Sequence, residues 1–220
     1  MRILLLGATG RTGKYLLDQA LAHGHIVHAL VRDKQRIQIQ KYNLLLFQGT
    51  PTDKTSLDKA MQGCEAVLSV LNISRKYEFP WSGLRTPKDF LSTAMKNIIE
   101  LSAKNNVRRV VFASAWGVGE TKKYLPRWFR WLVNNSSLRY QYLDHERQEE
   151  IARKSNLDWT AIRPVFLTNS KTRNKVVVTD HNEPRPYLYL GRSALATFML
   201  NVLEKNLYFC QAPVISEARG

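Results

Sequence analysis

Three glycines recur at a spacing of three near the start of the chain: Gly7, Gly10 and Gly13. They follow the apolar run Arg2 to Leu6 and precede an amphipathic segment, Tyr15 to Leu21. A glycine turn between a buried strand and a helix leaves backbone N–H groups available, where the helix dipole favours negative charge. Gly7 permits the tight turn, Gly10 lets the backbone approach a phosphate, and Gly13 lets the helix pack against the strand. The spacing therefore indicates a site for the pyrophosphate of a dinucleotide.

A second apolar run, Ile26 to Val31, completes a strand–turn–helix–strand unit. The turn could belong to another unit of this kind, but the full context favours a dinucleotide site. Arg32 ends this strand and Arg36 follows four residues later. Arginine here suits the 2′-phosphate of NADP, whereas an acidic residue would bind the ribose hydroxyls of NAD. We therefore predict a preference for NADPH; the alternatives are that Asp33 pairs with Arg32 or reaches the ribose, or that both arginines are ordinary surface charges.

Two polar residues are candidates for a part in catalysis. Ser114 follows the predicted strand Val107 to Ala113, so it should lie at the carboxyl end of that strand, where ligands bind in parallel sheets. Its hydroxyl could hydrogen-bond a carboxamide or a substrate carbonyl, or it could simply be a turn residue. His145 could donate a proton, but its neighbours Glu146 and Glu149 equally suit a surface histidine.

Other catalytic patterns are missing from the sequence. No tyrosine has a lysine four residues later, a pair that lowers the tyrosine pKa for alcohol–ketone chemistry. Reduction of a flavin does not need this pair, since a flavin can be protonated from solvent. No Ser-His-Asp spacing supports a hydrolase. Cys64 and Cys210 lie far apart and indicate neither a disulfide framework nor a metal site, and we interpret His23, His25 and His28 as structural.

The remaining pattern alternates apolar runs with helical segments over 220 residues. It predicts an α/β fold, a Rossmann-like doubly wound parallel sheet with helices on both faces, in a single NAD(P)-binding domain over residues 1–220. Strands are expected near residues 2–6, 26–31, 44–47, 66–71, 107–113 and 157–164, with a β segment at 175–179 and an edge strand at 209–215. Further helices are expected near residues 55–62, 88–105, 138–155 and 191–204. The substrate side is expected to comprise residues 74–87, which could form a flap, 116–138 and 165–190.

The segment Lys122 to Leu132 mixes basic and aromatic residues. It could contact a membrane, nucleic acid, a protein partner or an aromatic substrate. We favour a simpler interpretation, in which an amphipathic helix packs Trp128, Trp131 and Leu132 onto the domain.

The formal net charge of +15 favours anionic partners. Because the charge is spread along the chain, we interpret it as a solvated surface and expect no nucleic-acid partner. No stretch approaches the length of a membrane span, and the first apolar run is too short for a signal peptide. Two cysteines suit a reducing compartment. We expect a cytoplasmic protein, a monomer or weak dimer, that acts on a small molecule.

Five features together resemble a known family: the glycine turn, Val31-Arg32-Asp33 with Arg36, Ser114-Ala115, the helix around His145, and Leu157 to Pro164. They resemble the atypical short-chain dehydrogenases that bind NAD(P)H, especially the flavin reductase/biliverdin-IXβ reductase group and its bacterial relatives. The resemblance covers most of the chain. It implies hydride transfer from NADPH to a flavin or similar planar acceptor, and in some members to linear tetrapyrroles.

The resemblance also implies roles for residues. Arg32 and Arg36 would bind the 2′-phosphate, and Ser114 would lie beside the nicotinamide. Together with the strand-end argument, which adds the end of the fourth strand, the expected cofactor-binding residues are Gly7, Thr9, Gly10, Arg11, Thr12, Gly13, Arg32, Arg36, Thr50, Leu71, Asn72, Ser114, Pro164 and Val165.

The sequence departs from the family in several places. Asn72 stands where the reductase group has glycine, and Val165 where the biliverdin-reducing members have histidine, which weakens a tetrapyrrole assignment. Trp116 to Leu138 is longer than in those members. An alternative function is a non-catalytic NADP(H)-binding redox sensor or regulator, for which the positive charge and the basic aromatic segment would supply a partner surface. A nucleotide-sugar isomerase or dehydratase is disfavoured by the short chain and the absent tyrosine–lysine pair.

Overall fold

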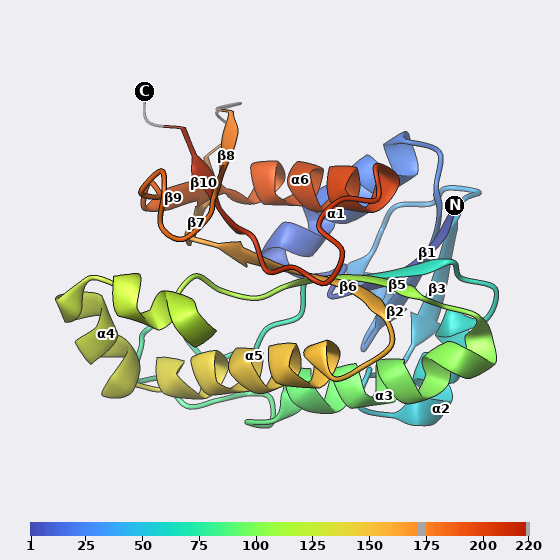
Figure 1. The fold of residues 1–220 in the computed structure, drawn as a ribbon. Helices are drawn as coiled ribbons and strands as arrows, with labels where there is room; N and C mark the ends of the chain where they lie inside the picture. Colours follow the sequence, from blue (N-terminus) through green and yellow to red (C-terminus); the bar gives the residue numbers. More distant parts are fainter. Residues whose placement is uncertain (171–174, 219–220) are drawn as a thin grey trace.

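The computed structural model describes residues 1–170 and 175–218, and it contains a central eight-stranded sheet (Figure 1). The order across this sheet is β3-β2-β1-β4-β5-β6-β10-β8. Its strands are β1 (Arg2–Leu6), β2 (Ile26–Val31), β3 (Leu44–Gln48), β4 (Ala66–Ser69), β5 (Arg109–Ala113), β6 (Asp158–Pro164), β8 (Val176–Thr179) and β10 (Val214–Glu217). A small second sheet pairs β7 (Phe166–Thr168) with β9 (Tyr189–Gly191).

All neighbouring strands of the large sheet are parallel except β8, which runs antiparallel to β10. The order reverses at β1, because β2 and β3 extend the sheet to one side and β4, β5 and β6 to the other. In sheets of this type ligands bind at the carboxyl ends of the strands, where the order reverses. The predicted Rossmann-like doubly wound fold is therefore confirmed, with the glycine turn after β1 at the reversal point.

Helices cover both faces of the sheet (Figure 1). Successive side chains of a strand point to opposite faces; accordingly Leu5 packs in a buried cluster with Leu16 and Leu200, and Leu4 in another with Leu57. One face carries α1 (Arg11–Ala22) and α6 (Arg192–Glu204), and the other carries α2 (Lys54–Met61), α3 (Phe90–Asn105) and α5 (Leu138–Arg153).

No helix in the described part of the chain is long and apolar enough to cross a membrane.

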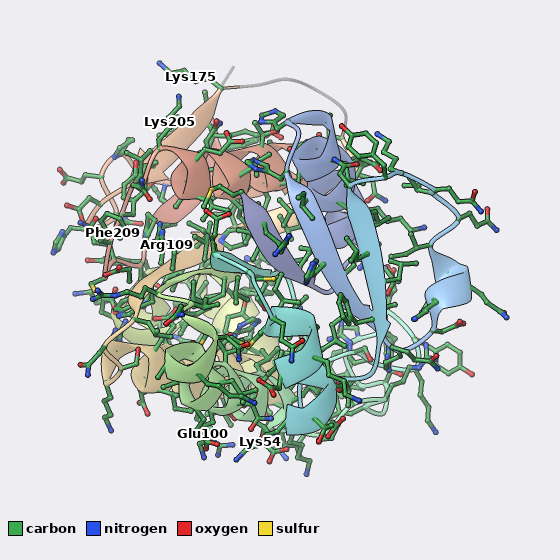
Figure 2. All side chains as sticks on the ribbon, turned by 90° about the vertical axis from the view of Figure 1, so that its right-hand side faces the viewer. Lys54, Glu100, Arg109, Lys175, Lys205 and Phe209 are labelled. Carbon is green, nitrogen blue, oxygen red and sulfur yellow. The ribbon has the colours of Figure 1, made fainter. Side chains whose placement is uncertain are left out.

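The amino-terminal edge of the sheet is held by Arg109, the first residue of β5. Its guanidinium is buried and donates to Thr160 Oγ1 and Leu207 O, both at 2.8 Å. It also lies over the ring of Phe209 at 4.6 Å, and Figure 2 shows these two side chains together. Burial lowers the pKa of Arg109 to about 10, so the group stays charged at neutral pH.

At the surface, Lys54 of α2 forms an ion pair with Glu100 of α3, at the bottom of Figure 2.

The last strand differs from the prediction. An edge strand at 209–215 was expected, but β10 begins only at Val214 and lies inside the sheet, between β6 and β8. Tyr208 and Cys210 have φ values of 56° and 55°, in the left-handed region, so the chain turns there and cannot be extended. β4 likewise ends at Ser69, two residues before the predicted end.

The basic aromatic segment also differs from the prediction. It forms a 3₁₀ segment, Gly119–Tyr124, and then α4 (Arg127–Asn134), which lies beyond the amino-terminal end of α5 (Figure 1). Of the three residues expected to pack onto the domain, Leu132 does so, whereas Trp128 and Trp131 are each 60% exposed. The buried residues are Phe129 and Val133, because their spacing of four puts them on the same face of the helix.

The glycine turn yields a stability prediction. A Cβ added to Gly13 would lie 1.9 Å from the backbone oxygen of Gly7, and neither backbone can move freely. We therefore expect Gly13→Ala to lower the free energy of unfolding by about 2 to 3 kcal/mol, measured by urea denaturation. Gly83→Ala is the matched control, since nothing lies within 4 Å of its added Cβ. Equal stability of the two variants would contradict this close packing.

Candidate functional site

The glycine turn has the geometry of an anion site. Gly7 has φ +89°, and Gly10 N donates to Gly7 O at 2.9 Å, which closes the turn before α1. No side chain caps the start of α1, and its first turn contains no acidic residue. Thr9 and Thr12 are partly exposed beside it. The first N–H groups of the helix can therefore bind a negatively charged ligand.

Three arginines come together near this turn. Arg11 Nη1 lies 2.7 Å from Glu78 Oε1 in the 74–87 loop. Burial lowers the pKa of Arg75 and of Arg192, and the positive charge of Arg11 lowers both further. Arg192 Nη1 donates to Asn169 Oδ1 at 2.8 Å. Arg75 and Arg192 were not predicted from the sequence, because no spacing relates them to the glycines.

A cavity of about 410 Å³ lies at the carboxyl ends of β2 and β3. Two predicted cofactor residues, Arg32 and Thr50, are among its lining. Asp33 Oδ1 accepts a hydrogen bond from Gln35 N at 3.0 Å, and within the described residues no ion pair joins it to Arg32. Arg36 is exposed and lies outside the lining. The full lining is Arg32, Gln48, Gly49, Thr50, Thr52, Asp53, Arg85, Thr86, Pro87 and Phe90.

Ser114 is bound into a network of buried charges. Its hydroxyl donates to Glu149 Oε1 at 2.6 Å. The guanidinium of Arg163 donates two hydrogen bonds to the same carboxylate, from Nε to Oε1 at 2.9 Å and from Nη2 to Oε2 at 2.6 Å. The side chains of Arg163 and Glu149 are 0% and 1% exposed. Ser114 thus stands at the end of β5 as predicted, but its hydroxyl faces α5; a catalytic role stays a prediction.

The network continues to the surface through two further residues. Arg153 Nη2 lies 2.9 Å from Glu149 Oε2, and Glu120 pairs with Arg163. Burial opposes the ionisation of Glu120, but the hydrogen bonds and charge of Arg163 outweigh it and hold the pKa of this carboxyl below its ordinary value. The network therefore ties β6 to α5 and to the 3₁₀ segment that precedes α4.

His145 is not a surface histidine, contrary to one of the two expectations for it. Its side chain is 3% exposed, and burial lowers its pKa to about 4. Nδ1 has no hydrogen-bond partner among the described residues, and the same is true of Gln148 Oε1 one helical turn on. The ring is thus neutral at pH 7, and it does not face solvent as a proton donor would.

The carboxyl ends of β5 and β6 run side by side beyond the strands. Ser114 N donates to Ile162 O at 2.7 Å, and Trp116 N donates to Pro164 O at 3.0 Å. Val165 is buried, and its N–H bonds Ile215 O at 3.2 Å. The structure thus brings the predicted residues Ser114, Pro164 and Val165 together. At the end of β4, Leu71 is partly buried and Asn72 is exposed.

An aromatic cluster lies next to the end of β6, where Phe166 follows Pro164 by two residues. Its members are Trp128, Phe129, Phe166, Tyr187 and Tyr189. The ring of Phe166 lies 4.5 Å from that of Phe129, and 6.5 Å from those of Trp128 and Tyr189. The rings of Tyr187 and Tyr189 are 5.7 Å apart. Three members, Trp128, Tyr187 and Tyr189, are exposed. Such ring faces can stack on a planar molecule. From the sequence only Trp128 could be singled out among these residues, because no spacing relates α4 to β7 and β9.

The 74–87 loop spans the distance between the glycine turn and α4. Glu78 bonds Arg11 at one end. At the other, Trp81 Nε1 donates to Asn135 O at 2.8 Å, and Ser137 N donates to Pro80 O at 2.9 Å. This is the position expected of a flap, and its closure over a ligand stays a prediction. Of the 165–190 segment, residues 171–174 lie outside the described residues.

Comparison with known proteins identifies the family. Residues 7–206 match a family described as NAD(P)H-binding. The chain belongs to this NAD(P)H-binding family. NAD(P)H binding is thus confirmed at the level of the family, and the roles of the individual residues at the glycine turn and at the strand ends stay predictions.

Relatives of the NAD(P)H-binding protein include reductases. It is 28% identical to dihydroflavonol 4-reductase of Solanum lycopersicum over 204 residues, which cover 75% of this chain and 49% of that enzyme. The chain thus spans about half the length of this relative. The chain is also 23% identical, over 86% of its length, to a chloroplastic protein of Arabidopsis thaliana that is described as uncharacterised.

Solved structures share the fold at low identity. ChuY, described as an anaerobilin reductase of Escherichia coli O157:H7, superposes with a TM-score of 0.81 at 17% identity, covering 100% of this chain and 98% of that one. A short-chain dehydrogenase/reductase of Veillonella parvula in complex with NADP has a TM-score of 0.79 at 20% identity, covering 98% and 94%. These similarities agree with the resemblance seen in the sequence, and at this identity they establish the fold alone.

The burial of His145 predicts a pH dependence of stability. Its pKa is depressed to about 4 in the folded state, against about 6.5 when unfolded, so protons bind the unfolded state first as the pH falls. The buried, uncharged His145 makes its full contribution to the free energy of unfolding above pH 6.5. About 3 kcal/mol of that free energy is lost by pH 4. We expect His145→Leu to remove this part of the pH dependence, measured by urea denaturation across that range. The exposed His181 supplies the control variant, His181→Leu. Parallel curves for wild type and His145→Leu would show the prediction to be wrong.

Proposed function

We propose that this protein is an NADPH-dependent reductase that passes hydride from the nicotinamide to a flavin or a similarly planar acceptor. The observation that carries the proposal is the aromatic cluster, which begins two residues beyond Pro164 at the carboxyl edge of the sheet. Two residues of chain span at most about 7 Å. A planar acceptor stacked on Phe166 and Trp128 would therefore lie next to a nicotinamide held near Ser114 and Pro164.

The cofactor would be held by its charged groups. The N–H groups at the start of α1 and the guanidinium of Arg11 would bind the pyrophosphate. Arg32, supported by Arg85 in the same cavity, would bind the 2′-phosphate. When bound, NADPH supplies the hydride. The protein contributes alignment, since holding donor and acceptor in contact removes most of the entropic cost of their encounter.

The acceptor is expected to need no protein acid. The Ser114 hydroxyl is engaged by Glu149, His145 is buried and neutral, and the chain has no Tyr-x-x-x-Lys pair. Reduction of a carbonyl to an alcohol requires a proton at the oxygen, which Ser114 and His145 are not placed to supply. A flavin can take its proton from water. Cytoplasmic location and a monomeric or weakly dimeric state remain part of the proposal.

A non-catalytic NADP(H) sensor is the second candidate. It is favoured by the engaged Ser114 hydroxyl and the buried His145, the two residues expected to take part in catalysis, and by the exposed face of α4, where Trp131 and Arg127 point away from the core. The two candidates differ in turnover. A sensor binds NADPH tightly but does not oxidise it, whichever acceptor is supplied, whereas a reductase oxidises NADPH at a rate that saturates with the acceptor.

Turnover and the aromatic cluster can be tested together. NADPH oxidation is followed by absorbance with FMN, riboflavin and biliverdin as acceptors. For the acceptor that is reduced, we expect Trp128→Ala to raise KM about tenfold through lost stacking, with NADPH affinity unchanged. Trp131→Ala is the matched control, because this residue is equally exposed but joins none of the ring contacts found in the described residues. Tight NADPH binding without turnover on any acceptor would favour the sensor, and equal effects of both variants would reject the stacking role.

The cofactor preference rests on Arg32. We expect Arg32→Ala to raise the Kd for NADPH about 10- to 100-fold and to leave that for NADH unchanged, because only NADPH carries the 2′-phosphate. Titrations followed by nicotinamide fluorescence measure both. Arg108→Ala is the charge-matched control, since Arg108 is exposed at the opposite end of the sheet, just before β5. Equal affinity of the wild type for the two cofactors would remove the argument for the 2′-phosphate.

A further inference from the structure

A second group of chemically capable side chains lies far from the cofactor edge. His23 follows the end of α1, His25 precedes β2, and Glu204 is the last residue of α6. Glu204 Oε1 lies 2.8 Å from His23 Nδ1 and 2.7 Å from His25 Nε2. Figure 1 shows α1 and α6 side by side on one face of the sheet, which is why these three residues meet. Within the residues that the structure describes, no other histidine, cysteine and carboxylate side chains form a group of this kind.

The backbone sets this arrangement. Gly24, between the two histidines, has φ +80° and reverses the chain from α1 into β2. The two imidazoles therefore approach the same carboxylate oxygen from neighbouring positions in the sequence, with ring centres 6.4 Å apart. A third donor from α6, almost two hundred residues away, completes the group. This is a convergence of three elements on one point, not a run of charged residues on one helix.

The donor atoms suit a transition metal. Two imidazole nitrogens and one carboxylate oxygen are common ligands of Zn²⁺, with a fourth position for water. The three atoms lie within 4.8 Å of one another. Bonds of 2.0 to 2.1 Å in a tetrahedral shell would separate the donors by about 3.3 Å, so small side-chain shifts suffice. His23 Nδ1 and His25 Nε2 both hydrogen-bond Glu204 Oε1, so the three donor atoms already face one another.

Access to the group is one-sided. The side chain of His23 is 48% exposed and that of Glu204 24%, whereas that of His25 is 9% exposed. An ion from solution can therefore reach the carboxylate past His23, while His25 forms the floor. We propose that His23, His25 and Glu204 form a binding site for a divalent transition metal ion, with Zn²⁺ as the best match to the ligand set.

The proton balance permits this step. The Glu204 carboxylate can only accept, so each facing imidazole nitrogen carries a proton. When the ion binds, each imidazole carries this proton on its other nitrogen, and the histidines need not lose one. In His25 the other nitrogen, Nδ1, lies 3.5 Å from the amino group of Met1, which turns away once Nδ1 carries the proton.

The site would serve stability and not hydride transfer. His25 stands just before β2, whereas the cofactor is expected where β2 ends, six residues of strand or about 20 Å away. A bound ion would join the end of α1, the start of β2 and the end of α6. This inference does not depend on the proposed reductase function, because it involves none of the same residues.

The test is a zinc titration of the whole protein followed by thermal unfolding. At a zinc concentration one hundred times Kd we expect the midpoint to rise by about 5 °C, and EDTA to reverse the rise. His23→Ala and Glu204→Gln should abolish the shift. Both residues are partly exposed, so these variants should fold, and an unchanged midpoint without zinc checks this. His181→Ala removes an exposed histidine elsewhere, so this variant should keep the zinc-dependent rise of the midpoint.

Cobalt gives a direct view of the ligands. Co²⁺ in a tetrahedral site absorbs visible light, so wild type and His181→Ala should develop the bands and His23→Ala should not. Zinc should leave the affinity for NADPH unchanged. No zinc-dependent shift in the wild type, or the same shift in His23→Ala, would overturn the proposal.

Discussion

The buried ion pair between Arg163 and Glu149 constrains the part of the molecule that carries Ser114, α4 and the aromatic cluster. Both side chains are removed from water, so each needs the other, and losing one partner of such a pair costs about 3 to 5 kcal/mol. Strand β6 and helix α5 must therefore pack in one relative position. That position fixes the Ser114 hydroxyl, which bonds Glu149, and, through the pair of Arg163 with Glu120, the segment leading to α4. The aromatic cluster is thereby held at a set place beyond Pro164, and alignment of this kind is what a hydride-transfer enzyme contributes.

Local patterns predicted the first half of the fold well. Short apolar runs and a glycine turn act over neighbouring residues, so β1, α1 and β2 followed from composition and spacing alone. The position of β10 did not follow, because pairing of Val214 with Arg163 is decided by contacts between distant parts of the chain. The left-handed turns at Tyr208 and Cys210, which exclude an extended strand, have no glycine to mark them.

The site shows the same division. Arg32 was predictable because it ends a strand, whereas Arg75 and Arg192 reach the turn from a loop and a distant helix. His145 was open to misinterpretation because acidic neighbours suggest a solvated face, and yet Glu149 is buried by an arginine that sequence spacing does not reveal. Trp128 and Phe129 are adjacent aromatic residues on a short helix, so periodicity alone did not decide which of them turns inward.

The placement of β10 inside the sheet has a consequence for biosynthesis. Strand β6 gains its second neighbour only when residues 214–217 have left the ribosome, some fifty residues after β6 itself. Until then the nascent chain presents β6 as an open edge, with backbone groups able to pair with another chain. Helix α6 emerges in the interval and can cover its face of the sheet first. Closure of the sheet around β10 is accordingly a late event, and the period before it is when the growing chain is most exposed to association.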